Sequence, residues 1–520
     1  MIGEYNLRTS FKQKLAGFSA ALLLLSSGIG LLNPVFAHAA TALTITPQIS
    51  FTFDDGLLST YTNAAPTLQK YGLVGTDYVI SGCVGMTTAP NTCAADNNGI
   101  YMTYAQIQAL QNTYGWEIGG HTADHGCMAS DAILSPDDCT NAAPLTFAQL
   151  ETELNGSKQT LQTNGLNITD MAWPYGDYGN ASLSVAAKYF ATTRGFADND
   201  ANNVFPFNDL VLHDQQFQAG APTTAWAICP DMSVAGAESC IDNAITNKQW
   251  VVLVFHNITA TPNTTTSSYD EATANLDAIA AYAAAKQTAG LVKVVTPSKG
   301  IVTGTNLLPN GDFVSGITGG WTTDSASITA DANNNGRYPE PTHSVLLKGG
   351  ATDTHLYSPK VAVTSGQTYV LKNYVNILSG TSVNFYINEY DASGNALPGV
   401  DPKAGIAYID CAVTTKCIDV ADVNFTYTPS SASVASASLQ VIVKGAATQA
   451  YYDGAQWFIP GSTLKAGDVN GDGAINLTDL SLLSSHWNTA SGATRAQGDL
   501  NGDGAVNLTD LSILSSNWGK

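Results

Sequence analysis

The sequence predicts a multidomain chain with three folded parts: a parallel α/β sheet or barrel, then a β-sandwich, then a small helical domain built by duplication. Three observations support this prediction. Short apolar runs alternate with helical stretches between about residues 43 and 296. Beyond residue 298 the composition shifts to Thr, Ser, Gly and Asn, with strands of period two. The last 55 of the 520 residues contain an internal repeat at a 31-residue offset.

The first 39 residues have the pattern of an export signal. Arg8, Lys12 and Lys14 precede an apolar run over residues 18–32, and Ala37-His38-Ala39 offers a small-x-small cleavage site. An anchoring helix is the alternative, but these 15 apolar residues fall short of the ~20 that a bilayer requires. We therefore expect a secreted protein with no membrane span in the mature chain.

The charge balance argues against a nucleic-acid partner. The formal net charge is −21, and loss of the export signal removes Glu4 and three cations to leave −23. Nucleic-acid binding needs clustered Lys and Arg, whereas an acidic excess favours solubility and cation binding.

Eight cysteines form four pairs of near neighbours in the sequence. Export permits oxidation, and no C-x-x-C spacing is present, so disulfides are favoured over a zinc ribbon or a redox pair. The expected pairs are Cys83 with Cys93, Cys127 with Cys139, Cys229 with Cys240, and Cys411 with Cys417.

The first part, residues 40–300, shows strand-helix-strand alternation over residues 49–53, 57–71 and 77–80. Residues 250–255 are continuously apolar, as expected of a strand covered on both faces. The second part, residues 301–460, contains alternating strands such as 368–375, 383–390 and 437–443. Pro460-Gly461-Ser462-Thr463 is a plausible linker to the third part, residues 461–520.

Four polar clusters in the first part each follow directly on an apolar strand. They are Asp54-Asp55, residues 121–125, Pro174-Tyr175 and His256. The carboxyl ends of parallel strands converge on one rim, so these clusters should meet. One carboxylate with two imidazoles suits zinc or a similar divalent ion.

The spacing His121-x-x-x-His125 predicts a helical turn with both rings on one face. A second carboxylate beside the metal ligands can take a proton from water, and a remote histidine can protonate a leaving group. This combination predicts a hydrolase.

Four motifs resemble, in order, those of the NodB-homology polysaccharide deacetylases (carbohydrate esterase family 4). They are Thr52-Phe53-Asp54-Asp55-Gly56, His121-Thr122-Ala123-Asp124-His125, Pro174-Tyr175-Gly176 and Leu253-Val254-Phe255-His256. The resemblance covers roughly half of the chain and implies a distorted (β/α) barrel. It implies hydrolysis of acetyl groups, either N-linked on chitin-like or peptidoglycan sugars or O-linked on xylan.

The same resemblance implies a role for each site residue. Asp55, His121 and His125 would bind the metal, with zinc the first candidate and cobalt or a similar ion the second. Asp54 would be the general base and His256 the general acid. The backbone N–H of Tyr175 would help to hold the oxyanion, and Thr122 would fix the loop between the two histidines.

Two departures from the family pattern stand out. The arginine that normally precedes the motif tyrosine by three residues is replaced by Ala172. Arg194 is the candidate substitute, in a cluster Thr192-Thr193-Arg194 that should follow the next strand. The aspartate-plus-tryptophan motif that usually tunes the histidine acid is not found.

Two other hypotheses stay open. In one, which these departures motivate, the barrel is catalytically impaired and the chain is a scaffold-docked carbohydrate-binding protein. In the other, the chain is a calcium-dependent structural protein of the cell surface and binds no transition metal.

The second part resembles jelly-roll carbohydrate-binding modules at its opening and its close. The residues that carry this resemblance are 306–313, Gly319-Gly320-Trp321 and Tyr451-Tyr452-Asp453. Exposed aromatic rings could stack on sugars, although a structural spacer is the alternative. The aromatic candidates, which could equally be sandwich core, are Trp321, Tyr386, Tyr390 and Trp457.

The duplicated third part contains two loops with oxygen ligands at positions 1, 3, 5, 9 and 12 and glycine at position 6, as a calcium loop requires. The first loop offers Asp468, Asn470, Asp472, the carbonyl of Ala474, Asn476 and Asp479. The second loop offers Asp499, Asn501, Asp503, the carbonyl of Ala505, Asn507 and Asp510.

Each loop leads into a helix with a predicted apolar stripe, Leu480, Leu483 and Trp487 in one and Leu511, Leu514 and Trp518 in the other. A loop with one helix, duplicated, resembles type I dockerins, which attach enzymes to cohesin modules on a scaffold. By that resemblance Thr478 and Thr509 would lie on the recognition face, and the protein would be extracellular and attached to a scaffold or cell surface. A tail made rigid by calcium, with no partner, is the alternative.

Overall fold

The computed structural model describes residues 46–87, 93, 100–128, 145–195, 203–213, 215–216, 233–263, 269–408, 419–461, 465–469, 475–490, 497–500 and 505–519. The predicted export signal lies outside the described residues, as do Cys139, Cys229, Cys411, Cys417, Asn470, Asp472, Ala474, Asn501 and Asp503. Within these ranges, no helix combines the length and the hydropathy needed to cross a membrane.

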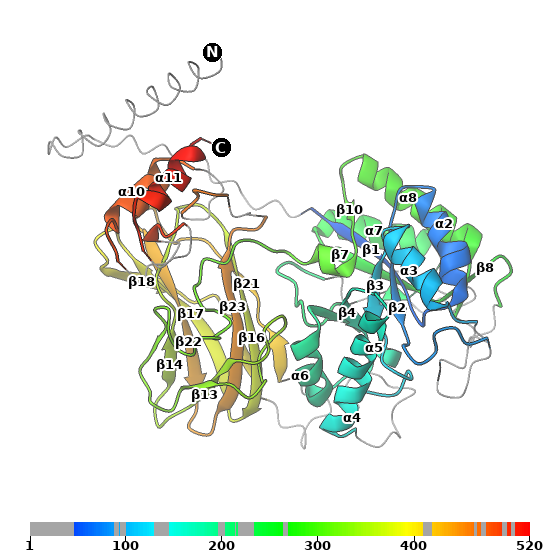
Figure 1. Cartoon of the computed structure of the whole chain (residues 1–520), viewed down its shortest axis with the longest axis horizontal. Helices are drawn as coiled ribbons and strands as arrows, with labels where there is room; N and C mark the ends of the chain where they lie inside the picture. The colour runs from blue at the N-terminus through cyan, green and yellow to red at the C-terminus, as the bar shows by residue number, and fades with distance from the viewer. Residues whose placement is uncertain are drawn as a thin grey trace, which may run out of the picture. The chain divides into compact units, whose positions relative to one another are not determined.

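A parallel eight-stranded sheet organises the first part (Figure 1). Seven of its strands follow the order β5-β4-β3-β2-β1-β7-β6, and β10 pairs with β1. Among the described residues no pairing joins β5 to β6, so the barrel is open, which confirms the predicted distorted (β/α) barrel. The strands are β1 (Gln48–Phe53), β2 (Thr76–Val79), β3 (Glu117–Gly120), β4 (Ile168–Ala172), β5 (Thr192–Arg194), β6 (Gln215–Gln216), β7 (Trp250–Phe255) and β10 (Lys293–Val294).

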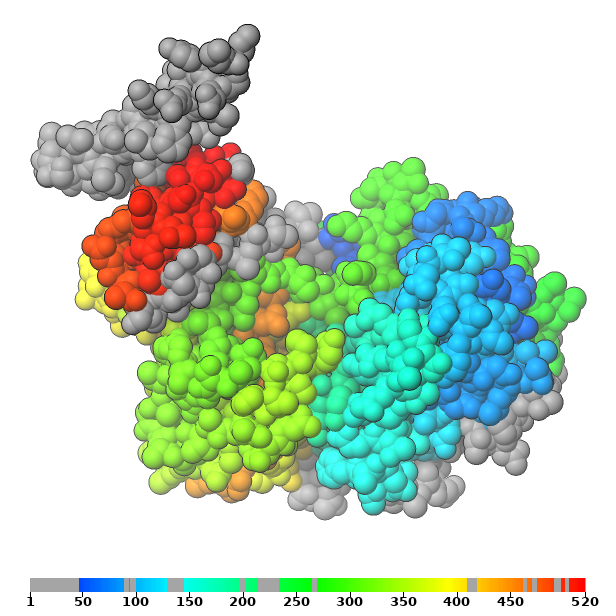
Figure 2. Space-filling view, viewed as in Figure 1, coloured from blue at the N-terminus to red at the C-terminus, as the bar shows by residue number. Residues whose placement is uncertain are grey.

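Helices follow the strands along the chain and cover the sheet; Figure 2 shows helix side chains, in blue to green, on one face of this part. All six residues of β7 are buried, as the apolar run predicted. The helix predicted from residue 57 begins at Leu58 and passes through a π-helical stretch, Thr60–Ala64, into α2. The helices are α2 (Ala65–Gln69), α3 (Tyr104–Asn112), α4 (Phe147–Glu151), α5 (Ser157–Thr163), α6 (Asn180–Tyr189), α7 (Val234–Asn247), α8 (Thr273–Thr288) and α9 (Pro297–Gly300), and a separate pair of strands is formed by β8 (Asn257–Thr259) and β9 (Asp270–Ala272).

The second part is a β-sandwich of two antiparallel sheets, as predicted. Side chains alternate inward and outward along the strands, so that Phe385 faces the core and Tyr386 faces outward. One sheet has seven strands, β11 (Thr322–Thr323), β14 (Thr354–Tyr357), β15 (Val361–Ala362), β17 (Ser382–Tyr390), β18 (Ala396–Val400), β19 (Gly405–Ala407) and β22 (Ser436–Lys444). The other has six, β12 (Thr329–Asp331), β13 (Ser344–Lys348), β16 (Tyr369–Ser379), β20 (Val420–Asp422), β21 (Phe425–Tyr427) and β23 (Gln449–Phe458).

The third part contains the two helices α10 (Leu477–Ser485) and α11 (Leu508–Ser516), each placed directly after its loop as predicted. Leu483 and Leu514 are buried in a small shared core, but Trp487 and Trp518 are each 40% exposed. The predicted apolar stripes are therefore wrong at their last position. Each helix ends two residues before its tryptophan, so the helical spacing no longer directs that side chain toward the core.

Cys83 and Cys93 form a disulfide, which confirms the first predicted pair. Cys127 takes part in a disulfide as well, and so does Cys240, each in a separate bond. The other four cysteines lie outside the described residues.

Candidate active site

The ends of neighbouring strands bring the predicted catalytic residues together. Asp54 and Asp55 follow β1, where the Asp54 N–H donates to Phe255 O of β7 at 2.9 Å. His121 follows β3, and its N–H donates to Val79 O of β2 at 3.0 Å. Because every strand pair here is parallel, these carboxyl ends lie on one edge of the sheet, as the sequence predicted.

Asp55, His121 and His125 form a compact cluster of three metal-type ligands. One ligand atom from each residue lies within 4.8 Å of the others. Nε2 of His121 and Nε2 of His125 are each 3.6 Å from Oδ1 of Asp55. Residues far apart in the sequence therefore converge around a single point, as predicted.

The protonation of the two histidines fits a metal ligand set. Nδ1 of His121 lies 2.9 Å from the carbonyl of Ala172, and only an N–H can bond to a carbonyl there, so Nε2 keeps its lone pair. Burial lowers the pKa of His121 and lowers that of His125 much further. Two neutral imidazoles and a carboxylate suit zinc or a similar divalent ion.

The helical turn predicted for His121 to His125 is wrong. Residues 121–128 form a loop, with φ of 63° at both Thr122 and His125. Thr122 holds this loop: its Oγ1 accepts from the His125 N–H at 3.1 Å, and its carbonyl accepts from Ser157 Oγ at 2.8 Å. The two rings still meet, with centroids 4.9 Å apart.

Left-handed backbone is concentrated in the site. Asp55 (φ 77°), Thr122 and His125 (both 63°) and Tyr175 (57°) all adopt positive φ without being glycine. Such conformations are costly and tend to persist where function requires them. Tyr175 lies in a 3-10 turn after β4, and its ring centroid is 4.6 Å from that of His125.

Arg194 binds Asp54 directly. Its Nη2 donates to both carboxylate oxygens at 2.5 Å, and both side chains are buried. Burial alone would raise the pKa of Asp54, but the Arg194 guanidinium, with smaller contributions from His121 and His256, holds it below its usual value. Asp54 is therefore a carboxylate at neutral pH.

Arg194 reaches Asp54 from a strand rather than from the loop after it. Thr192, Thr193 and Arg194 form β5 itself, which corrects the predicted position. Arg194 and Ala172 are register partners in the β4–β5 pair. The guanidinium thus comes from the strand next to the position where the family motif places it.

His256 lies on the other side of Asp54, with its Nε2 3.9 Å from Oδ2 of the carboxylate. Burial lowers the pKa of His256 to about 4, although the negative charge of Asp54 opposes this shift. The imidazole is therefore neutral at pH 7. Its ring centroid is 5.0 Å from that of Tyr269.

Three family models match separate stretches of the sequence. Residues 44–193 match a polysaccharide deacetylase, residues 305–449 a carbohydrate binding domain, and residues 466–517 a dockerin type I domain. The chain carries all three kinds of domain. The first is called the deacetylase domain below, the second the carbohydrate-binding domain, and the third the dockerin domain.

Solved structures of family 4 carbohydrate esterases and of a carbohydrate binding module are similar to this chain at low sequence identity. A family 4 carbohydrate esterase from Streptomyces lividans in complex with acetate is 18% identical, with a TM-score of 0.29 over 49% of this chain and 97% of its own. A family 4 acetyl xylan esterase from Clostridium thermocellum with a cobalt ion is 17% identical, with a TM-score of 0.29 over 49% and 89%. A family 16 carbohydrate binding module is 18% identical, with a TM-score of 0.22 over 29% and 99%. No curated protein matches the chain.

The deacetylase domain also holds buried polar residues that sequence reasoning missed. The guanidinium of Arg194 lies over the ring of Tyr78, 5.0 Å from its centroid, and the Tyr78 hydroxyl donates to Asp170 Oδ2 at 2.8 Å. Asp77 is fully buried beside Asp54 and Asp55, and burial raises its pKa well above the usual value. The available signal was an aspartate inside a short buried strand, which rarely occurs without a partner or a function.

The carbohydrate-binding domain separates the four aromatic candidates into two classes. Trp321 and Trp457 are core residues, at 3% and 0% exposure. Tyr386 and Tyr390 point outward from β17. Tyr386 and Tyr357 are both register partners of Gln440, so the three side chains form one row across the outer face of the seven-stranded sheet.

The dockerin domain buries the carboxylates at the first and twelfth positions of both predicted calcium loops. Asp479, at position 12, is fully buried and accepts from the N–H groups of Val469 and Asn476 at 2.7 and 2.9 Å. Asp510 repeats this arrangement with Leu500 and Asn507 at 2.8 and 2.9 Å. The carboxylates at the first positions, Asp468 and Asp499, are buried as well. Thr478 and Thr509, together with Leu477 and Leu508, lie exposed at the helix starts.

Proposed function

We propose that this chain is an extracellular, divalent-metal-dependent hydrolase that removes acetyl groups from a polysaccharide. The observation that carries the proposal is the contact of the buried Asp54 carboxyl group with Arg194, next to the cluster of Asp55, His121 and His125. That combination provides a base beside a metal site.

Asp55, His121 and His125 would hold the ion, with zinc the first candidate and cobalt or a similar ion the second. When bound, such an ion polarises a carbonyl and makes water more acidic. Asp54 would accept the proton of the attacking water. The backbone N–H of Tyr175 would help to stabilise the oxyanion.

His256 would return a proton to the leaving group. Since burial keeps its imidazole neutral at pH 7, His256 must first gain the proton that it later donates. Asp54 would pass on the proton that it takes from water, since its Oδ2 lies 3.9 Å from Nε2 of His256. The carboxylate regenerated in this way favours the imidazolium form. The leaving group would be a sugar oxygen on an O-acetylated polymer such as xylan, or a sugar nitrogen on chitin or peptidoglycan.

Removal of the metal should abolish this activity reversibly. Dialysis against a chelator is expected to reduce acetate release from acetylated xylan oligomers and from chitin oligomers at least about tenfold, because the three ligand residues cannot polarise the acetyl group themselves. Adding zinc or cobalt should restore the rate. The measurement is acetate release, with the bound metal counted by elemental analysis. Release that stays unchanged when the bound metal is gone would contradict metal dependence.

The alternative, a carbohydrate-binding protein with an impaired barrel, was motivated by Ala172. The contact of Arg194 with Asp54 supports the enzyme instead, because it supplies the missing guanidinium from the adjacent strand. Silence on both oligomers with metal bound, together with retained binding to the polymers, would favour the alternative.

The outer face of the seven-stranded sheet is the proposed sugar-binding surface of the carbohydrate-binding domain. Its row of Tyr357, Gln440 and Tyr386 combines two aromatic rings with an amide, which suits a sugar ring. We expect Tyr386→Ala to weaken binding to insoluble xylan or chitin by about tenfold, since one stacking contact is lost. Tyr451→Ala, on the outer face of the other sheet, is the matched control. Equal binding by both variants and the wild type would place the sugar site elsewhere.

The dockerin domain would bind two calcium ions and attach the chain to a cohesin-bearing scaffold. The buried carboxylates of Asp479 and Asp510 in matching positions support the calcium sites. The exposed Leu477–Thr478 and Leu508–Thr509 pairs would contact the partner, with an apolar side chain next to each hydroxyl.

A further inference from the structure

We propose that the carbohydrate-binding domain also fixes α6 and β5 of the deacetylase domain in place, a role called the clamp below. Through these contacts, Arg337 positions Arg194. The positioning role rests on the proposed function, because Arg194 matters through Asp54. The clamp holds the segment from α6 to β5, which begins at Asn180, soon after Tyr175, and ends at Arg194.

Arg337 of the carbohydrate-binding domain binds the end of α6 directly. Its Nη1 donates to Ala187 O at 3.2 Å and to Phe190 O, and its Nη2 donates to Ala191 O at 2.6 Å. The next N–H, that of Tyr338, donates to Ala187 O at 2.8 Å. The last carbonyls of a helix have no partner within the helix, so a segment of another domain supplies the cap.

This cap is buried and neutralised. The side chain of Arg337 is 8% exposed, and it pairs with Asp422 of the same domain at 2.9 Å. Lys158 of α5 donates to the carbonyl of Tyr189, in the same stretch of backbone. The ammonium of Lys158 lies over the Tyr338 ring, 4.7 Å from its centroid. Buried carbonyls and charges that lose such partners are costly, so removing Arg337 should loosen the end of α6.

The carbohydrate-binding domain also holds the start of α6. The N–H of Asp419 donates to the Asn180 side chain at 2.7 Å. Asn180 is the first residue of α6 and follows the Tyr175 turn closely. Both ends of this one helix are therefore fixed by the same neighbouring domain.

The strand that carries Arg194 is supported on its outer side as well. β5 is the last strand of the sheet, and beyond it lies the segment around residue 210. The Thr193 N–H donates to Leu210 O at 3.1 Å, and the Leu212 N–H donates to Thr193 O at 2.8 Å. That segment is tied to the carbohydrate-binding domain twice. Lys372 forms an ion pair with Asp209, and Asn424 donates to Phe207 O at 2.7 Å.

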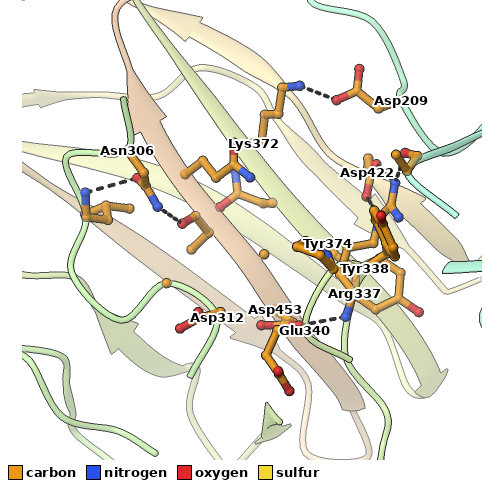
Figure 3. Close-up of a pocket in the computed structure, with 18 of the residues that line it drawn as sticks. Asp209, Asn306, Asp312, Arg337, Tyr338, Glu340, Lys372, Tyr374, Asp422 and Asp453 are labelled. Atoms are coloured by element: carbon orange, nitrogen blue, oxygen red, sulfur yellow. Dashed lines mark hydrogen bonds and ion pairs between the residues drawn. The ribbon is translucent and has the colours of Figure 1, made fainter. Parts of the chain in front are cut away.

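A cavity of 440 Å³ lies beside these contacts, lined by Arg337, Lys372 and Tyr374 from one domain and by Asp209 and Ala191 from the other (Figure 3). Figure 3 shows the two cations reaching their partners, Lys372 toward Asp209 and Arg337 toward Asp422. Tyr374 and Val420 pack into the same apolar cluster as the deacetylase core. The contact is thus a continuous packed interface and not a loose tether.

The test compares the full-length protein with the double variant Arg337→Met/Asp422→Asn. This variant removes both charges of a buried pair and keeps similar volumes, so no charge is left stranded. We expect amide hydrogen exchange in residues 180–195 to become at least about tenfold faster, while β17 is unchanged. On the acetylated oligomer that the wild type hydrolyses, kcat should fall about tenfold to a hundredfold with KM unchanged, because Arg194 is displaced and the sugar contacts are not.

The matched control is Lys403→Met/Asp401→Asn, an exposed ion pair of the same domain with side chains 83% and 47% exposed. It should change neither exchange nor kcat. Unchanged exchange in residues 180–195 of the Arg337 variant would refute the clamp. Faster exchange with wild-type kcat would refute the positioning of Arg194.

The experiment still gives an answer if the wild type is inactive or if the Arg337 variant does not fold. If the wild type hydrolyses neither oligomer, the proposed function fails while hydrogen exchange still decides the clamp. If the Arg337 variant does not fold, Lys372→Met/Asp209→Asn is measured instead. In that variant, faster exchange over residues 192–195 and 207–212 with a lower kcat supports the clamp, and wild-type behaviour refutes it.

Discussion

Asp54→Asn should lower kcat for acetate release by about 10²- to 10⁴-fold, the range by which a positioned general base accelerates a reaction. The amide has nearly the same shape as the carboxylate and can still accept from Arg194, but it cannot take a proton from water. The bound metal should be unchanged, since Asp55, His121 and His125 are untouched. Initial rates and elemental analysis on the same sample separate these two effects.

The control for Asp54→Asn is Asp277→Asn, which makes the same chemical change at an exposed carboxylate paired with Lys70. It should leave the rate at the wild-type value. An Asp54→Asn enzyme with normal kcat and normal metal content would remove Asp54 from the mechanism.

Arg194→Met should have the second largest effect, a loss in kcat/KM of about tenfold to a hundredfold at neutral pH. The Arg194 guanidinium is the main group that lowers the pKa of Asp54 against the effect of burial. Without it the folded-state pKa of Asp54 rises, so the base becomes protonated at a higher pH than in the wild type. The acid limb of the pH profile of kcat/KM should therefore move to higher pH.

A transplanted arginine provides the sharper version of this test. Ala172 and Arg194 are register partners on adjacent strands, so Arg194→Ala/Ala172→Arg returns the guanidinium to its position in the family motif. We expect this double variant to regain part of the lost rate and to move the acid limb back. If Arg194→Met leaves the acid limb where it was, Arg194 does not tune Asp54.

The candidate site was predictable because strand ends are visible in the sequence. An apolar run that ends in Asp54-Asp55 or in His256 marks both a buried strand and the rim where parallel strands converge. The antiparallel sandwich and the duplicated loops were visible for similar reasons, from period-two alternation and from self-similarity.

The remaining features depend on information that spacing does not carry. The i, i+4 spacing of His121 and His125 fits a helix and a loop equally, and the loop forms because Thr122 and His125 adopt positive φ. The hydrogen bond between Tyr78, which packs on Arg194, and Asp170 joins residues 92 positions apart, so no local sequence pattern predicts it. The cap that Arg337 supplies to α6 joins two domains and is likewise invisible before the chain is folded.

The site residues with positive φ affect which substitutions a mutagenesis screen would select. Asp55, Thr122, His125 and Tyr175 owe their shape to backbone torsions that most L-amino acids resist. In a mutagenesis library, glycine at Thr122 would relieve this strain and be enriched by selection for thermal stability, yet it would delete the hydroxyl that accepts from His125. Screens for heat resistance and screens for turnover should therefore favour different residues at that position.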